Sequence, residues 1–215
     1  LNPHAIAQPT RTNARGKPVD VESDGKNLSG FIAKLPSEKQ DALQAQLQNF
    51  YPPLRKMEIK RQQYGWKSLL LSELERTVFT ASNLSYGTLR LFVVLSQQYA
   101  TYKTVVFDEI ENGLNQELFE KLVHELLHYG SPQKQVIVTT HSGLLLNYLP
   151  DGIARESVFF FSKDKKRNTV ARRFFEIPEI REKLQVLGPG EVMGDTDLIE
   201  LSRDVAENAS ENSAS

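Results

Sequence analysis

Two adjacent carboxylates, Asp108 and Glu109, directly follow the run TVVF at residues 104–107. A short β-branched and apolar run without polar alternation is typical of a strand buried on both faces. Carboxylates at the end of such a strand lie where α/β sheets bind ligands, so Asp108 could hold Mg²⁺ through water and Glu109 could orient or deprotonate an attacking water. Acidic residues also end strands because loops are solvated, and the pair alone leaves both interpretations open.

Polar motifs stand on both sides of this pair. Upstream, Ser85 in the segment NLSYGT could cap a helix predicted over about 86–99, and Gly87 would let backbone N–H groups approach an anion. Downstream, His141 follows the run QVIVT at 135–139, and its imidazole could hydrogen-bond a terminal phosphate oxygen. Each motif also has a simpler interpretation, a capped helix for the first and a structural histidine for the second.

The order of these motifs resembles the C-terminal lobe of ABC-type ATPases. LSYGT, an apolar strand ending in DE, the turn ENGLN, and an apolar strand ending in THS follow one another along the chain. The form is closer to SMC-, RecF- and overcoming-lysogenisation-defect-type ATPases than to transporters, because Arg90 and Glu111 match their LSxGxxR and DExExxLH patterns. Tyr86 and Thr88 depart from the transporter sequence LSGGQ, and Asn115 stands where Asp or His is usual.

This resemblance covers roughly residues 25–200 and implies ATP and Mg²⁺ as ligands. It implies a signature motif that reaches nucleotide held by the partner in a head-to-tail homodimer. The implied site residues are the catalytic Glu109 and His141, the metal-binding Asp108, and the cofactor-binding Ser85, Gly87 and Asn115.

A P-loop of the form G-x-x-x-x-G-K-[ST], whose amides and lysine bind phosphates, is missing from the 215 residues. The two Gly-Lys pairs, at 16–17 and 25–26, are followed by proline and asparagine and lack the first glycine. By the resemblance, the P-loop belongs to an N-terminal lobe of the same protein before Leu1. The chain is therefore expected to be the C-terminal lobe of an ATPase, inactive alone.

The apolar runs also predict the elements that position these residues. Strands are expected over 104–108, 135–140 and 158–161, with helices over about 115–129 and 142–149. Strand–helix–strand order argues for parallel pairing. The expected fold class is α/β, a mostly parallel sheet flanked by helices, which the resemblance makes P-loop NTPase-like. Parallel strands share one carboxyl edge, so Asp108, Glu109 and His141 are expected there together.

Composition shifts predict the boundaries of the domain. Residues 1–26 lack periodicity and are expected to form an irregular arm. The ATPase lobe is expected over 27–205, with a helical and strand insert at about 27–80 and the signature-to-switch region at about 82–162. The tail 206–215, rich in Asn, Ser, Glu and Ala, is predicted to be disordered. Within the insert, one helix is predicted to begin at Leu28 and end at Pro36, and a second to begin at Ser37 and end at Pro52. Strands are predicted over 54–60 and 68–74, and Trp66 and Leu69–Leu71 are predicted to lie in the core.

Two further patterns suggest other chemistry. His124, Glu125 and His128 match H-E-x-x-H on a predicted helix, the zinc-peptidase pattern, but a third ligand is not evident and helix-surface histidines are favoured. A basic turn could contact DNA phosphates or could simply be solvated. Its cations are Lys163, Lys165, Lys166 and Arg167.

Composition excludes several classes of protein. Lys+Arg 26 against Asp+Glu 27 gives a net charge of -1, which demands neither a nucleic acid nor an anionic membrane as partner. The absence of cysteine excludes disulfides, Cys-ligated zinc and thiol chemistry. No apolar run approaches the about 18 residues of a membrane span, so no membrane partner and a cytoplasmic location are expected.

The leading hypothesis is therefore ATP binding and hydrolysis coupled to a DNA-related or defence function. A non-catalytic interaction module that keeps the ATPase fold, and a transporter-type ATPase subunit, are the alternatives.

Overall fold

The computed structural model describes residues 6, 8–11, 20–73, 77–129, 133–164 and 166–211. The chain forms two compact units, residues 1–139 and 140–215. Each unit has its own set of buried apolar side chains.

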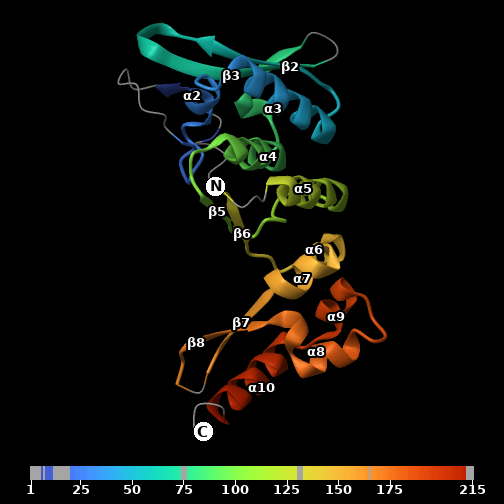
Figure 1. Ribbon diagram of the computed structural model, residues 1–215. Helices are drawn as coiled ribbons and strands as arrows, with labels where there is room; N and C mark the ends of the chain where they lie inside the picture. Colours follow the sequence, from blue (N-terminus) through green and yellow to red (C-terminus); the bar gives the residue numbers. More distant parts are fainter. Residues whose placement is uncertain are drawn as a thin grey trace. The chain divides into compact units, whose positions relative to one another are not determined.

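The insert of the first unit is an antiparallel sheet covered by two helices (Figure 1). Its elements are α2 (Leu28–Ile32), α3 (Ser37–Phe50), β1 (Thr10–Arg11), β2 (Leu54–Arg61), β3 (Trp66–Glu73) and β4 (Val78–Thr80). The strand order is β1-β3-β2, with β4 also paired to β3. Leu69 and Leu71 of β3 are buried. The predicted strands and helices of this region are thus confirmed.

Part of the predicted irregular arm belongs to the folded unit. Ile6 and Val21 are buried, and β1 pairs with the first residues of β3. Asn27 stands at the start of α2, but its amide binds the preceding loop, accepting the Glu22 N–H at 2.8 Å and donating to the Asp20 carbonyl at 2.7 Å. The rest of the predicted arm, residues 1–5, 7 and 12–19, lies outside the described residues.

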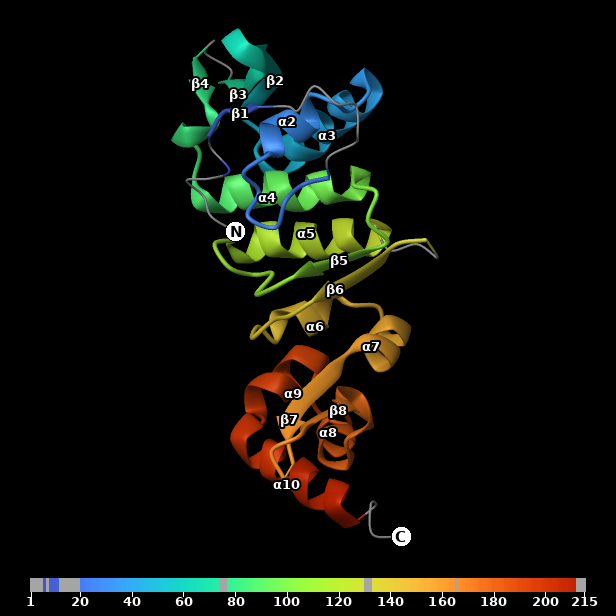
Figure 2. The same cartoon turned by 90° about the vertical axis from the view of Figure 1, so that its left-hand side faces the viewer.

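The second half of the first unit contains the elements around the carboxylate pair. They are α4 (Tyr86–Ser96), the 3₁₀ turn Gln97–Tyr99, β5 (Thr104–Phe107), α5 (Gln116–Tyr129) and β6 (Gln135–Val138). Strands β5 and β6 pair in parallel, from Thr104 opposite Gln135 to Phe107 opposite Val138, which confirms the predicted adjacency. Helix α5 lies between α4 and this strand pair, and α4 lies beneath α2 and α3 (Figure 2).

A lysine joins the start of β6 to the end of α4. Lys134 donates to the carbonyls of Gln97, Gln98 and Ala100 at 2.6, 3.3 and 3.0 Å. A cation satisfies the free carbonyls of a helix C-terminus and interacts favourably with the helix dipole. Burial lowers the pKa of Lys134.

Only one face of the parallel pair is covered within the described residues. Val105 and Phe107 are buried, whereas Val106 is 62% exposed and Ile137 is 42% exposed. The prediction of a strand buried on both faces was therefore wrong for β5. The uniform apolar sequence shows that both faces suit burial, but it does not supply the layer that would cover the second face.

The second unit contains a hairpin surrounded by short helices. Its elements are α6 (Leu144–Tyr148), α7 (Asp151–Ser157), β7 (Phe159–Lys163), β8 (Thr169–Arg173), the 3₁₀ turn Phe174–Glu176, α8 (Pro178–Lys183), α9 (Pro189–Asp195) and α10 (Leu198–Glu211). Strand β7 pairs antiparallel with β8 and is not a third parallel strand. The fold class is α/β as predicted, with parallel pairing confined to β5 and β6 among the described strands.

The predicted disordered tail is wrong for residues 206–211, which continue α10. Asp197 caps this helix, since its carboxylate accepts the N–H groups of Ile199 and Glu200 at 2.8 and 3.2 Å. Leu201 and Val205 are buried one helical turn apart, and that burial stabilises the helix despite its polar composition. Residues 212–215 lie outside the described part. None of the described helices has the length and apolar character needed to cross a membrane.

Candidate functional site

The carboxylate pair lies at the carboxyl edge of β5 and β6, where a threonine holds it. Because Phe107 pairs with Val138, the next residues along the strands, Asp108 and Thr139, lie side by side. The Thr139 hydroxyl donates to Asp108 Oδ1 at 2.5 Å and accepts the N–H of Glu109 at 2.9 Å. The sequence motifs suggested no role for Thr139, although adjacent parallel strands in equal register would place it beside Asp108.

Glu109 lies in an unusual backbone conformation for a residue other than glycine. Its φ is 47°, in the left-handed region, which costs a residue other than glycine about 1–2 kcal/mol. Asn112 stabilises the turn, because its N–H donates to the Glu109 carbonyl at 2.9 Å and its Nδ2 donates to Glu109 Oε2 at 3.1 Å. Asp108 and Glu109 are both exposed. The pair is thus oriented by the protein and open to a ligand.

Arg90 connects the helix of the LSYGT motif to the carboxylate pair. Its side chain is buried, with 5% of its surface exposed. One guanidinium nitrogen, Nη2, donates to the carbonyl of Asp108 at 2.7 Å and to the carbonyl of Glu109. The other, Nη1, donates to the Tyr86 hydroxyl at 3.3 Å. Hydrogen bonds from a charged donor are among the stronger ones in proteins, so Arg90 couples α4 to the turn after β5.

Two glycines let the LSYGT and ENGLN motifs approach each other backbone to backbone. A Cβ added at Gly87 would lie 2.2 Å from the carbonyl oxygen of Gly113, closer than real Cβ contacts allow. Gly113 has a φ of +79°, and a Cβ there would lie 2.8 Å from the Tyr86 ring. Gly87 therefore has a packing role that sequence reasoning did not foresee, while its approach to a nucleotide stays a prediction.

Ser85 and Asn115 are helix caps. The Ser85 hydroxyl accepts the N–H of Thr88 at 3.1 Å and begins α4, which confirms the predicted cap. The Asn115 side chain accepts the N–H of Leu118 at 2.9 Å at the start of α5. Both side chains are exposed at helix N-termini, where anions are favoured. Their predicted contacts with a nucleotide stay predictions.

His141 belongs to the second unit, three residues after β6 ends. His141 is exposed. The N–H of the following residue, Ser142, donates to the Thr140 hydroxyl at 3.0 Å. Its predicted place at one edge with Asp108 and Glu109, and its catalytic role, stay predictions.

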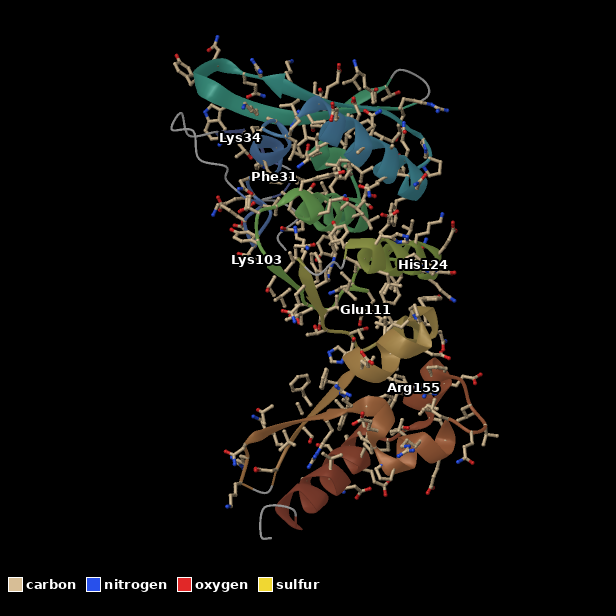
Figure 3. All side chains as sticks on the ribbon, in the orientation of Figure 1. Phe31, Lys34, Lys103, Glu111, His124 and Arg155 are labelled. Atoms are coloured by element: carbon tan, nitrogen blue, oxygen red, sulfur yellow. The ribbon has the colours of Figure 1, made fainter. Side chains whose placement is uncertain are left out.

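The H-E-x-x-H pattern on α5 does not form a metal site. The Nδ1 atom of His128 lies 2.7 Å from the backbone carbonyl oxygen of His124. Figure 3 labels His124 on this helix. Glu125 accepts a hydrogen bond from Gln46 at 3.1 Å. No group of three or more His, Cys, Asp or Glu side chains in the described ranges could hold a metal ion. The interpretation as helix-surface residues is the better one.

The sequence matches a family model described as "AAA domain, putative AbiEii toxin, Type IV TA system" over residues 4–147, more than half of the chain. The chain belongs to this AAA family. The description places this family among AAA domains, which are nucleotide-binding ATPase domains. No curated protein matches the sequence.

Solved structures similar to this AAA chain include heads of SMC ATPases. An Smc head domain with a coiled coil and joint from Pyrococcus yayanosii shares 13% identity at a TM-score of 0.47, covering 61% of this chain and 26% of that one. An Smc head bound to the C-terminal domain of ScpA, from Pyrococcus furiosus, shares 12% identity at 0.47, covering 76% and 44%. A structure from work on ATP-driven dimerization and DNA-stimulated activation of SMC ATPases shares 15% identity at 0.46, covering 70% and 95%.

The chain thus spans about a quarter of the first of these proteins and less than half of the second. At this identity and TM-score two chains need not share a function. The family assignment rests on the sequence match alone.

Proposed function

We propose that this AAA chain supplies four motifs of an ATP-hydrolysing site. They are the Walker B pair Asp108 and Glu109, the signature motif LSYGT, the D-loop ENGLN and the switch histidine His141. The observation that carries the proposal is the support of the acidic pair. Thr139 holds the Asp108 carboxylate at the sheet edge, and Arg90 ties the backbone of the pair to the LSYGT helix. In this proposal Glu109 positions and deprotonates the attacking water, and His141 contacts the γ-phosphate.

The donor set at the edge fits Mg²⁺. This ion prefers oxygen ligands and is usually held by one or two protein carboxylates, with waters and substrate phosphates completing its shell. Asp108 is an exposed carboxylate at the sheet edge with the Thr139 hydroxyl beside it. When bound, the ion would neutralise charge on the phosphates during phosphoryl transfer. Asp108 is the residue proposed to hold it.

A P-loop lobe, N-terminal in the same protein, is the proposed partner of this chain. Phosphoryl transfer needs a cradle of amides and a lysine around the phosphates, and the 215 residues contain no such motif. The open face of β5 and β6 supports this proposal. Val106 and Ile137 are exposed apolar side chains on that face, and a further layer packed on the sheet would bury them. We further propose a head-to-tail homodimer in which exposed Ser85, with Gly87, reaches the nucleotide bound to the other subunit.

ATP turnover tests this function. Residues 1–215 alone are expected to hydrolyse ATP negligibly, whereas the protein that includes the P-loop lobe is expected to hydrolyse it. Glu109→Gln should lower that rate by at least about 100-fold, the usual effect of losing a general base. The variant should still bind nucleotide and should accumulate as the nucleotide-bound dimer. Glu120→Gln, an exposed glutamate on α5, is the matched control and should leave the rate unchanged.

Two results would contradict the proposal. One is Mg²⁺-dependent turnover by residues 1–215 that Glu109→Gln leaves unchanged. The other is a protein with both lobes that binds ATP without hydrolysing it, which would favour a non-catalytic module.

The process coupled to hydrolysis is proposed to be defence or work on DNA. The family description names a toxin of a toxin–antitoxin system, and this supports the first. For the second, we propose DNA contact by the basic turn between β7 and β8, where Lys163, Lys166 and Arg167 are exposed and Lys165 lies outside the described residues. A joint change of Lys166 and Arg167 to glutamine should weaken duplex DNA binding at low salt; unchanged affinity would remove this proposal.

A further inference from the structure

The hairpin of β2 and β3 ends in a turn that presents an aromatic ring to solvent. Tyr64 and Gly65 have φ values of 57° and 80°, and the N–H of Trp66 donates to the Gln63 carbonyl. These features define a type I′ turn, whose first central position normally holds Asn, Asp or Gly because φ is positive there. Tyr64 occupies it instead and is 82% exposed. The ring at this position contributes no core packing.

Trp66 adds a second ring beside the turn. The sequence predicted it in the core, but it is 41% exposed. It is the first residue of β3 and lies next to the turn, beyond the buried leucines of the strand. The hairpin tip thus displays two aromatic side chains to solvent.

Cations lie at the same end of the hairpin as these rings, with Lys67 on the face of β3 opposite to that of Trp66. Arg61 and Lys67 lie directly opposite each other across the hairpin, a like-charge pair that destabilises a sheet. Lys34, two residues after the end of α2, adds a third positive charge on this side of the hairpin (Figure 3). The pKa of Lys67 is lowered by burial and then by the charges of Arg61 and Lys34, with no carboxylate raising it. Between residues that the structure describes, no ion pair involves Arg61 or Lys67.

This combination fits one class of partner better than others. Single-stranded nucleic acids offer unstacked bases to aromatic rings and phosphates to neighbouring cations. The bases of a duplex are already stacked and leave exposed rings unused. An acidic peptide would pair with the cations but has no reason to need two adjacent rings. We propose that the tip of the β2–β3 hairpin binds single-stranded nucleic acid, with bases stacking on Tyr64 and Trp66 and phosphates held by Arg61 and Lys67.

This surface contains none of the residues of the acidic pair. The basic turn belongs to the second unit. The proposal therefore stands or falls independently of ATP hydrolysis and of the proposed duplex contact.

Trp66 is the only tryptophan of the chain and reports binding directly. We expect an unstructured thymidylate oligonucleotide to quench its fluorescence and to bind less tightly as salt rises. Tyr64→Asn should raise the Kd about tenfold, which is the effect of losing one stacking contact. The hairpin should stay folded, because asparagine suits the type I′ turn. Joint replacement of Arg61 and Lys67 by glutamine should weaken binding and reduce the salt dependence.

Matched controls separate this site from general charge effects. Lys56, in the same strand, is paired with Glu58, and Lys56→Gln should change the Kd less than twofold. Lys166→Gln, in the other unit, should do the same. If Tyr64→Asn folds poorly by circular dichroism, the joint Arg61 and Lys67 variant decides.

Several outcomes overturn the proposal. They are the absence of Trp66 quenching, an unchanged Kd in folded Tyr64→Asn, equal quenching of Trp66 by a duplex of the same length, and equal quenching by polyglutamate. The last would identify an acidic protein as the partner instead.

Discussion

A methyl group at Gly87 is expected to force the LSYGT helix away from the ENGLN turn. The added Cβ would start 2.2 Å from the Gly113 carbonyl oxygen, and real Cβ atoms essentially never approach below 3.0 Å, so the two backbones must separate by about 0.8 Å. Overpacking of this kind typically costs about 1–3 kcal/mol. The higher helix propensity of alanine offsets this cost by less than about 1 kcal/mol. The net expectation is a loss of about 1–2 kcal/mol of stability.

Gly152→Ala is the matched control for this prediction. Gly152 is the second residue of α7, as Gly87 is the second residue of α4, but an added Cβ meets no atom within 4 Å. This variant should be unchanged or more stable by up to about 1 kcal/mol. Urea unfolding followed by circular dichroism, and by Trp66 fluorescence for the first unit, measures both. Equal stability of the two variants would refute the inferred close contact between the motifs.

Three further substitutions test the support of the acidic pair. Arg90→Met removes two hydrogen bonds from a buried charge to backbone carbonyls and should lower the free energy of unfolding by about 2–4 kcal/mol. The control Arg55→Met, at an exposed position, should lower it by less than about 0.5 kcal/mol. A loss for Arg90→Met as small as that of the control would contradict the coupling role of Arg90. Thr139→Val removes the hydroxyl that holds Asp108 and should cost about 1–2 kcal/mol in the same urea assay, with no change in the far-ultraviolet spectrum. Glu109→Gly should be more stable than Glu109→Ala by about 1 kcal/mol, because both lack the carboxylate and only alanine is strained at φ 47°; the reverse order would show that the turn relaxes.

Local patterns in the sequence were enough to predict most elements. The runs around Val105 and Val136 form adjacent parallel strands as predicted, because apolar β-branched runs joined through one amphipathic helix have few other solutions. Ser85 begins α4 as predicted, since capping depends on residues only three apart.

Contacts between distant segments could not be predicted in this way. Arg90 meets the backbone of Asp108 eighteen residues later, and Gly87 meets Gly113. Such pairs depend on how α4 packs, which periodicity does not specify. Thr139 is an intermediate case, because strand register alone would have placed it beside Asp108.

The errors also have physical causes. An apolar run such as that of β7 pairs equally well with a parallel or an antiparallel neighbour, and here the Asp164 turn brings β8 back as a hairpin. Trp66 was placed in the core on hydrophobicity, whereas the positive φ of Tyr64 and Gly65 puts it beside an exposed turn.

The most direct test of the proposed function is the ATPase rate of the protein with its P-loop lobe, measured for wild type, Glu109→Gln and Glu120→Gln. We expect wild type and Glu120→Gln to hydrolyse ATP equally, and Glu109→Gln to bind ATP but turn it over at least about 100-fold more slowly. A Glu109→Gln protein that hydrolyses ATP at the wild-type rate would contradict the assignment of this site.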